Sequence, residues 1–190
     1  MFRRWSLALF IAIASASLGA GQSVARSSEI VHLRLVDRLD RPQDGYCLDI
    51  LGVGRNMRLE VPIFAHNCKP FLTDDSAVEF NDAGEIRFVA VNLCITAAGV
   101  NSTILPGAAI LLRGCGHNAP FFESGPLQKF NHRKNGKLEL GTTGLCLAVG
   151  EKSSTTYSRR DRWRVLSVED CETTPDAFSQ WEFVTPPSRG

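Results

Sequence analysis

Six cysteines provide the clearest chemistry in this sequence, since paired thiols form disulfides and clustered thiolates bind metal ions. Their order divides them into three pairs, with 21, 21 and 25 residues from the first to the second member. The pairs are Cys47 and Cys68, Cys94 and Cys115, and Cys146 and Cys171. None of them has the Cys-x-x-Cys spacing that is typical of a metal site. We therefore predict three disulfides, no metal site and no cofactor.

An aspartate distinguishes the first pair from the other two. Similar stretches surround the first cysteine of every pair: Tyr46-Cys47-Leu48-Asp49, Leu93-Cys94-Ile95-Thr96 and Leu145-Cys146-Leu147-Ala148. Only the first stretch has an acid two residues after the cysteine. A carboxylate at this position can accept strong hydrogen bonds from a ligand, or it can accept backbone N–H groups in a turn. The first segment is therefore where we expect function.

The surrounding pattern predicts the elements that hold these residues. Apolar residues alternate with other residues before each first cysteine and again before each second cysteine, and polar turns at 81–84 and 134–136 separate the segments. Alternation with period two is typical of strands with one buried face. Each of three repeats thus contains about four short strands. The alternating residues are Leu33 and Leu35, Ile86 and Phe88, Leu138 and Leu140, Ile63 and Ala65, Ile110 and Leu112, and Leu166 and Val168.

Three such repeats predict an all-β chain. We expect a β-trefoil with pseudo-threefold symmetry, about twelve short strands and one disulfide within each repeat. A single four-stranded unit cannot bury its apolar face, whereas three units packed around an axis can. Closure into a barrel also removes exposed strand edges. A β-sandwich with unrelated cysteines is the alternative, and the threefold spacing argues against it.

The beginning of the chain has the pattern of a secretory signal. Arg3 and Arg4 precede a short apolar run from Leu7 to Ala20, so we predict a signal peptide over residues 1–25 with cleavage near residues 20–25. The run is too short to span a bilayer as a helix. Export to a secreted or periplasmic location favours disulfides. The formal net charge of +1 gives no indication of a nucleic-acid partner.

Residues 29–185 resemble the ricin B-type lectin trefoil. The resemblance rests on Cys-Leu-Asp-Ile at 47–50, on the apolar strand that ends in the second cysteine, and on the turn followed by Gly-x-Ile at 84–86. No repeat keeps the family's Gln-x-Trp signature whole, so the chain is similar to a divergent member. The signature falls on Ser76-Ala77-Val78, Gln128-Lys129-Phe130 and Ser179-Gln180-Trp181. The resemblance implies a protein without catalytic activity, either a free lectin that binds carbohydrate or the partner of a toxin subunit.

The resemblance also implies which residues would bind a sugar. In the family, an aspartate after the first cysteine accepts hydrogen bonds from sugar hydroxyl groups. An aromatic ring before the second cysteine packs on the apolar C–H face of the sugar. Polar groups near the Gln-x-Trp position complete the site. Asp49, His66 and Asp75 occupy these positions in the first repeat, and the other repeats lack both the aspartate and the ring. The residues there are Thr96 and Arg113 in the second repeat, and Ala148 and Glu169 in the third.

Each assignment has a structural alternative. Asp49 is also explained as a turn residue, His66 as an exposed strand residue, and Asp75 as a solvated acid in a polar loop. Phe64 would replace His66 if the strand register slipped. The basic run at 159–164, which contains Trp163, is explained either as a solvated loop or as a patch for nucleic acid or an acidic glycan.

Two functions follow from these features. The first is a non-catalytic, secreted lectin that binds a glycan or glycoconjugate through at most one sugar site, in the first repeat. The alternative is a trefoil whose sugar sites have decayed and which binds a protein partner, as a subunit, an inhibitor or a toxin-associated adaptor. The sequence has no Gly-x-Ser-x-Gly elbow and no phosphate-binding glycine loop, so we expect no enzyme activity.

Overall fold

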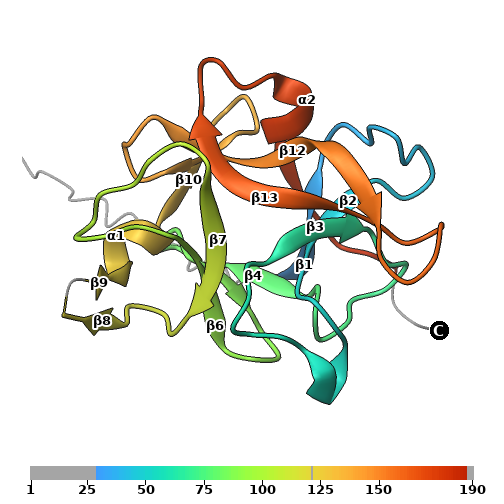
Figure 1. Cartoon of the computed structure of the whole chain (residues 1–190), viewed down its shortest axis with the longest axis horizontal. Coiled ribbons are helices and arrows are strands. Elements are labelled where there is room, and N and C mark those ends of the chain that lie inside the picture. The colour runs from blue at the N-terminus through green and yellow to red at the C-terminus, as the bar shows by residue number, and fades with distance from the viewer. Residues whose placement is uncertain (1–28, 121, 188–190) are drawn as a thin grey trace, which may run out of the picture.

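The computed structural model describes residues 29–120 and 122–187, and strands dominate this part of the chain (Figure 1). The predicted signal peptide, residues 1–25, lies outside the described residues. Three short helices connect strands, so the prediction of an all-β chain is confirmed. They are η1 (Gly54–Asn56), α1 (Ser124–Gln128) and α2 (Asp176–Ser179). Within the described ranges, no helix has both the length and the apolar character needed to cross a membrane.

Each predicted repeat contributes four strands to one sheet of twelve. The first repeat forms β1 (Ile30–Leu35), β2 (Tyr46–Asp49), β3 (Phe64–Asn67) and β4 (Val78–Phe80). The second forms β5 (Ile86–Phe88), β6 (Leu93–Ala97), β7 (Ala108–Arg113) and β10 (Phe130–His132). The third forms β11 (Leu138–Leu140), β12 (Leu145–Thr155), β13 (Arg162–Asp170) and β14 (Trp181–Val184). A separate hairpin consists of β8 (Asn118–Ala119) and β9 (Phe122–Glu123).

The strands close into a ring. β1 pairs with β2, β4 and β14, and β13 pairs with β3 as well as with β7 and β12. The ring therefore runs from β13 through β3, β2, β1, β4, β5, β6 and β7 and back to β13. In Figure 1, β13 crosses the front of the molecule between β7 and β3. This closure places the first and third repeats side by side.

The hydrophobic core includes all the residues that alternate in the sequence. All twelve alternating positions are at most 2% exposed. The final positions of the three Gln-x-Trp segments, Val78, Phe130 and Trp181, are equally buried. The indole N–H of Trp181 is satisfied by the carbonyl of Leu147 at 2.9 Å. Burial of these apolar side chains provides the main driving force for the fold.

The polar turn between the first and second repeats has a local cause. The Asn81 side-chain oxygen accepts the backbone N–H groups of Ala83 and Glu85 at 3.0 and 2.9 Å. Gly84 has a φ of +80°, and a Cβ there would lie 2.8 Å from the carbonyl oxygen of Phe130. Only glycine therefore fits this turn, which returns the chain into β5.

The three predicted disulfides are confirmed, and the hairpins that carry them share one register. Each first cysteine lies opposite the residue two positions before its second cysteine. The opposed residues are Cys47 and His66, Cys94 and Arg113, and Cys146 and Glu169. The Cα atoms of the bonded cysteines are 4.9 to 5.0 Å apart. The repeats are thus equivalent in structure, residue for residue, around their cysteines.

Removing one disulfide tests how much these links contribute to stability. Replacing both Cys146 and Cys171 by serine opens a link between residues 25 positions apart. Chain entropy then favours the unfolded state, and we expect the free energy of unfolding to fall by about 3 kcal/mol. Urea denaturation of the double variant and the wild type measures the difference. An unchanged free energy of unfolding would contradict an entropic role for this disulfide.

Candidate functional site

Asp49 lies at the end of β2, opposite Phe64 of β3. The same position is occupied by Thr96, opposite Leu111, in the second repeat and by Ala148, opposite Ser167, in the third. Because the register is shared, these three residues are structural equivalents. The first repeat is therefore the one that carries a carboxylate at this place.

Asp75 joins Asp49 in space. The backbone N–H of Ile50 donates to the carbonyl of Asp75 at 2.9 Å, which holds the loop before β4 against the end of β2. The Thr73 hydroxyl donates to Oδ1 of Asp75 at 2.7 Å. Asp75 is 3% exposed, whereas its neighbour Asp74 is exposed. The interpretation of Asp75 as a solvated loop acid is therefore wrong.

Lys69 connects the two carboxylates, although it is not among the site residues predicted from the sequence. Its Nζ lies 2.8 Å from Oδ2 of Asp49 and 2.6 Å from Oδ2 of Asp75. The two carboxylates are 5% and 4% exposed, and Lys69 is 26% exposed. Lys69 directly follows Cys68, so the disulfide that anchors the end of β3 also positions the lysine. One ammonium group thus forms ion pairs with two buried carboxylates.

Because two buried carboxylates share one ammonium group, the pKa of Asp49 is perturbed. Burial raises the pKa of Asp49 to about 7, because removal from water disfavours the charged form. The Lys69 ammonium opposes this rise, and the Asp75 carboxylate adds to it. The Asp49 carboxyl group therefore changes its charge close to neutral pH.

His66 lies beside the carboxylates as the strand register predicts. Its Nδ1 is 4.0 Å from Oδ2 of Asp49, which is too far for a hydrogen bond. Burial lowers the pKa of His66, and the Lys69 ammonium lowers it further. The side chain is 16% exposed, so the interpretation of His66 as a plain exposed strand residue is wrong.

Phe64 lines the same place without a change of register. Its strand pairs with β2 in the register of the other repeats, so the slip that would let Phe64 replace His66 does not occur. The Phe64 ring meets the His66 ring edge-on at 6.0 Å and the Trp163 ring at 5.9 Å between centroids. Three rings, those of His66, Phe64 and Trp163, therefore form a row that begins beside Asp49.

These residues surround a cavity of about 180 Å³, which we call the carboxylate cavity. Its wall comes from the end of β2 and the following loop, from β3, from Lys69 and Asp75, and from the hairpin between β12 and β13. The hairpin residues are Thr156, Tyr157 and Asp161. These three residues are not among those predicted from the sequence. The signal for them was the longer interval between the cysteines of the third repeat.

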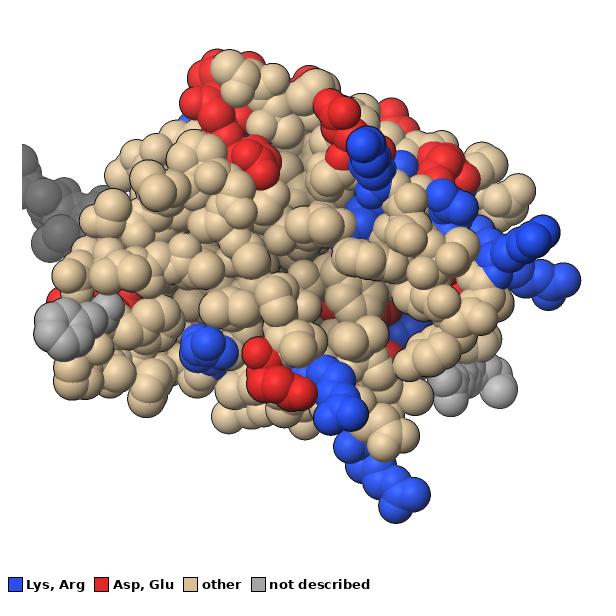
Figure 2. Space-filling model, in the orientation of Figure 1, with Lys and Arg blue, Asp and Glu red and all other residues tan. Residues whose placement is uncertain are grey.

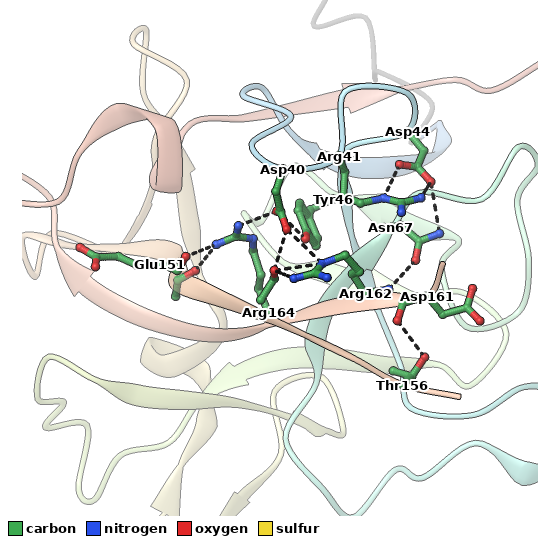
Figure 3. Close-up of polar contacts among 12 residues, drawn as sticks. Asp40, Arg41, Asp44, Tyr46, Asn67, Glu151, Thr156, Asp161, Arg162 and Arg164 are labelled. Carbon is green, nitrogen blue, oxygen red and sulfur yellow. Dashed lines mark hydrogen bonds and ion pairs between the residues drawn. The ribbon is translucent and has the colours of Figure 1, made fainter. Parts of the chain in front are cut away.

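A polar network holds that hairpin against the first repeat (Figure 3). Asp40, in the loop between β1 and β2, pairs with Arg164 at 2.6 Å and with Arg162 at 3.0 Å. The Asp40 carboxylate also accepts hydrogen bonds from the hydroxyl groups of Tyr46 at 2.8 Å and Ser153 at 2.7 Å. Burial opposes the ionisation of Asp40, but hydrogen bonds from Ser153, Arg164 and Tyr46 outweigh it and lower its pKa. Asp40 is therefore a fixed anion that joins two repeats.

The basic run begins as a solvated loop, as expected, since Arg159 and Arg160 are exposed in the turn before β13, but the network holds the two arginines that follow. Arg162 and Arg164 belong to β13, and Arg164 is 4% exposed. The Arg164 guanidinium lies 4.8 Å from the centre of the Tyr46 ring and donates to the carbonyls of Gly150 and Glu151. Trp163 packs at the start of the strand, as expected. Both strand arginines therefore pair with Asp40.

The equivalent places in the other repeats hold no pair of carboxylates. In the second repeat, Thr96 is fully buried and accepts the side-chain amide of Gln128 at 2.9 Å. In the third repeat, Ala148 is fully buried. The residues at the ring position are Arg113 and Glu169, and Glu169 accepts the hydroxyl of Ser167 at 2.6 Å. Any site of the first-repeat type is therefore confined to the first repeat.

One group of residues in the described ranges has the proximity of metal ligands. It consists of Glu85, Cys94 and Cys115. Cys94 and Cys115 form a disulfide with each other, so neither offers a thiolate. This group is therefore not a candidate metal site.

Comparisons with solved structures identify the fold. The agglutinin from Abrus precatorius matches 83% of this chain with 20% identity and a TM-score of 0.59, and the chain spans about half of that protein, 48%. The mdaA-1 domain matches 84% of the chain and 91% of its own length, with 18% identity and a TM-score of 0.56.

A third structure is the β-trefoil lectin of the Vibrio vulnificus hemolysin/cytolysin, solved with N-acetyl-D-lactosamine bound. It matches 86% of the chain and 99% of its own length, with 15% identity and a TM-score of 0.54. Neither a protein-family model nor a curated protein matches the sequence. The chain therefore shares the fold of ricin B-type lectins, as the sequence resemblance implied.

Proposed function

We propose that residues 29–185 form a secreted or periplasmic β-trefoil lectin, without catalytic activity, that binds a glycan through the carboxylate cavity. The observation that carries the proposal is the meeting of Asp49 and Asp75 at one cavity in the first repeat alone among the described residues. The fold shared with two lectins supports it. Three disulfides support export to an oxidising compartment.

The groups in the cavity match the chemistry of a sugar. The carboxylate oxygens of Asp49 and Asp75 can accept hydrogen bonds from sugar hydroxyl groups, and charge-assisted hydrogen bonds of this kind are stronger than neutral ones. Lys69 supplies a donor at the cavity wall. The rings of His66 and Tyr157 line the cavity and offer faces for the apolar C–H side of a sugar. Hydrogen-bond acceptors, a hydrogen-bond donor and two aromatic rings thus line the carboxylate cavity.

The Asp49→Asn substitution tests this function. It keeps the shape of the side chain but removes the charge, and we expect affinity for the bound glycan to fall about tenfold to a hundredfold. Glycan-array screening of the wild type identifies the glycan, and calorimetric titration measures the change. Asp74→Asn is the matched control, because the neighbouring Asp74 is exposed and should tolerate the change. Unchanged binding by Asp49→Asn, with circular dichroism showing an intact fold, would refute the assignment.

Binding should also depend on pH. Because burial raises the pKa of Asp49 to about 7, the group is ionised above this pH and protonated below it. Glycan affinity is therefore expected to be highest above pH 7 and to weaken as the pH falls towards 5. Burial lowers the pKa of His66 and so favours its neutral form, whereas the pKa of Asp49 is raised. Titrations at pH 5.5, 7 and 8.5 measure the effect, and an affinity independent of pH would contradict it.

A protein-binding role is the second candidate. It is favoured by the Lys69 ammonium, which already pairs with both carboxylates and so reduces their need for hydroxyl donors. On this proposal the sugar site has decayed, and the chain acts as a subunit or an inhibitor. Absence of binding to every glycan on an array, together with a defined complex with the product of a neighbouring toxin gene, would favour it over the lectin.

A further inference from the structure

A second, larger depression adjoins the carboxylate cavity. It has a volume of about 600 Å³ and lies between the first and third repeats, where β3 pairs with β13. We call it the apolar groove. Its lining includes Val61, Ile63, Trp163, Val165 and Leu166 and contains no charged side chain. Figure 2 shows that charged side chains gather mainly at the edges of this face, while the surface over β7 and β13 is largely uncharged.

The groove and the carboxylate cavity are adjacent and share part of their walls. Leu51, Phe64, Thr156 and Tyr157 line both of them. The row of rings described above follows the same path, because the Phe64 ring contacts His66 on the cavity side and Trp163 on the groove side. A ligand that occupies the cavity can therefore extend into the groove without leaving the surface.

The chemistry of the groove differs from that of the cavity. Apart from Thr156 and Tyr157, its lining side chains have no hydroxyl, amide or carboxylate group. Val165 is 54% exposed and Tyr157 is 93% exposed, so the groove presents apolar surface to water. A further sugar unit would find few hydrogen-bond partners there, whereas an alkyl chain would gain from leaving water. The polar groups needed to orient a ligand are instead concentrated at the carboxylate end.

We propose that the natural ligand is a glycolipid-like molecule whose sugar occupies the carboxylate cavity and whose alkyl chain occupies the apolar groove. This inference rests on the proposed lectin function, since the sugar must first be held by Asp49 and Asp75. It adds the class of the ligand, an amphipathic glycoside. The groove then contributes affinity that a free monosaccharide cannot obtain.

Paired glycosides that differ only in the aglycone test the proposal. Calorimetric titration is carried out with methyl and octyl β-D-galactopyranosides and with the same pair of glucopyranosides, below the concentrations at which the octyl forms make micelles. For the sugar that binds, we expect the octyl glycoside to bind at least tenfold more tightly than the methyl glycoside. Asp49→Asn should weaken both members of the pair.

A substitution in the groove separates its contribution from that of the cavity. Val165→Glu places a charge in the groove at a half-exposed position, so the fold should tolerate it. It should lower octyl affinity to the level of the methyl glycoside and leave methyl affinity unchanged. Val100→Glu is the matched control, because Val100 is 62% exposed and lines neither depression.

The outcomes distinguish this inference from the lectin function. Methyl binding that depends on Asp49, with no gain from the octyl chain, overturns the inference and leaves the lectin function standing. Octyl binding that is insensitive to Asp49→Asn overturns both, as does the absence of binding to all four glycosides and to every glycan on the array. A gain that survives Val165→Glu, or self-association of the chain that Val165→Glu abolishes, also overturns the inference, since the groove would then serve another purpose.

Discussion

Replacing Lys69 by methionine is expected to lower the free energy of unfolding by about 3–5 kcal/mol at pH 8, and by less at pH 5. The substitution keeps an unbranched apolar side chain but removes the ammonium that lies 2.8 and 2.6 Å from the two carboxylates. Asp49 and Asp75 would then be two adjacent buried anions without a compensating charge. Removal of one partner from a buried ionic group is costly because the remaining charge stays out of water.

The pH dependence follows from the direction of the pKa change. Burial already raises the pKa of Asp49 to about 7, and loss of the ammonium raises it further. A carboxyl group whose pKa is raised by folding stabilises the protein fully below its unfolded pKa and loses that contribution as the pH rises through the folded pKa. Protonation at pH 5 therefore relieves the repulsion, whereas at pH 8 the full cost remains.

Urea denaturation at pH 5 and pH 8 measures this effect. Lys69→Arg is expected to retain much of the stability, because it keeps a positive charge. Lys152→Met is the matched control for loss of a lysine, because Lys152 is exposed. A loss in Lys69→Met that is the same at both pH values would show that the ammonium does not compensate the carboxylates.

Replacing Asp40 by alanine is expected to lower the free energy of unfolding by about 1–3 kcal/mol, less than for a fully buried pair because the Asp40 side chain is 38% exposed. The side chain of Arg164 is 5% exposed, and Asp40 is the carboxylate that pairs with it at 2.6 Å. Without Asp40, the buried guanidinium keeps the carbonyls of Gly150 and Glu151 as acceptors but loses its counter-charge. The hairpin that carries Tyr157 would also lose its link to the first repeat. Glycan affinity should therefore fall together with stability.

A double-mutant cycle separates the buried charge from other effects. Arg164→Met removes the charge that Asp40 neutralises, so Asp40→Ala should cost much less in that background. The thermal unfolding midpoint and the urea midpoint of the four proteins give the coupling energy. Additive effects of the two substitutions would exclude this ion pair as the cause of the destabilisation.

The repeat architecture was predictable from the residues around the cysteines. Cys47, Cys94 and Cys146 begin similar stretches, and alternation with period two reports directly which strand face is buried. These patterns are local or depend on simple spacing, so they can be recognised without knowing which residues are in contact in the fold. The cross-strand pairing of Cys47 with His66 is a finding of the structure.

The candidate site was predictable only in part. Asp49 was identified because its equivalents Thr96 and Ala148 differ, whereas Lys69 had no pattern to mark it. The importance of Lys69 arises because the loop before β4 folds back and brings Asp75 to the same ammonium. Tyr157 was missed for a similar reason: its hairpin reaches the first repeat only because β13 pairs with β3.

The sequence alone determined the strands, the three disulfides and the position of the carboxylate that distinguishes the first repeat. The tertiary structure decided the environment of that carboxylate: the burial of Asp75, the shared ammonium of Lys69, and the apolar groove between the first and third repeats. The physical reason is that strand pattern is encoded by neighbouring residues, whereas burial and charge compensation arise from segments that meet only when the ring of strands closes.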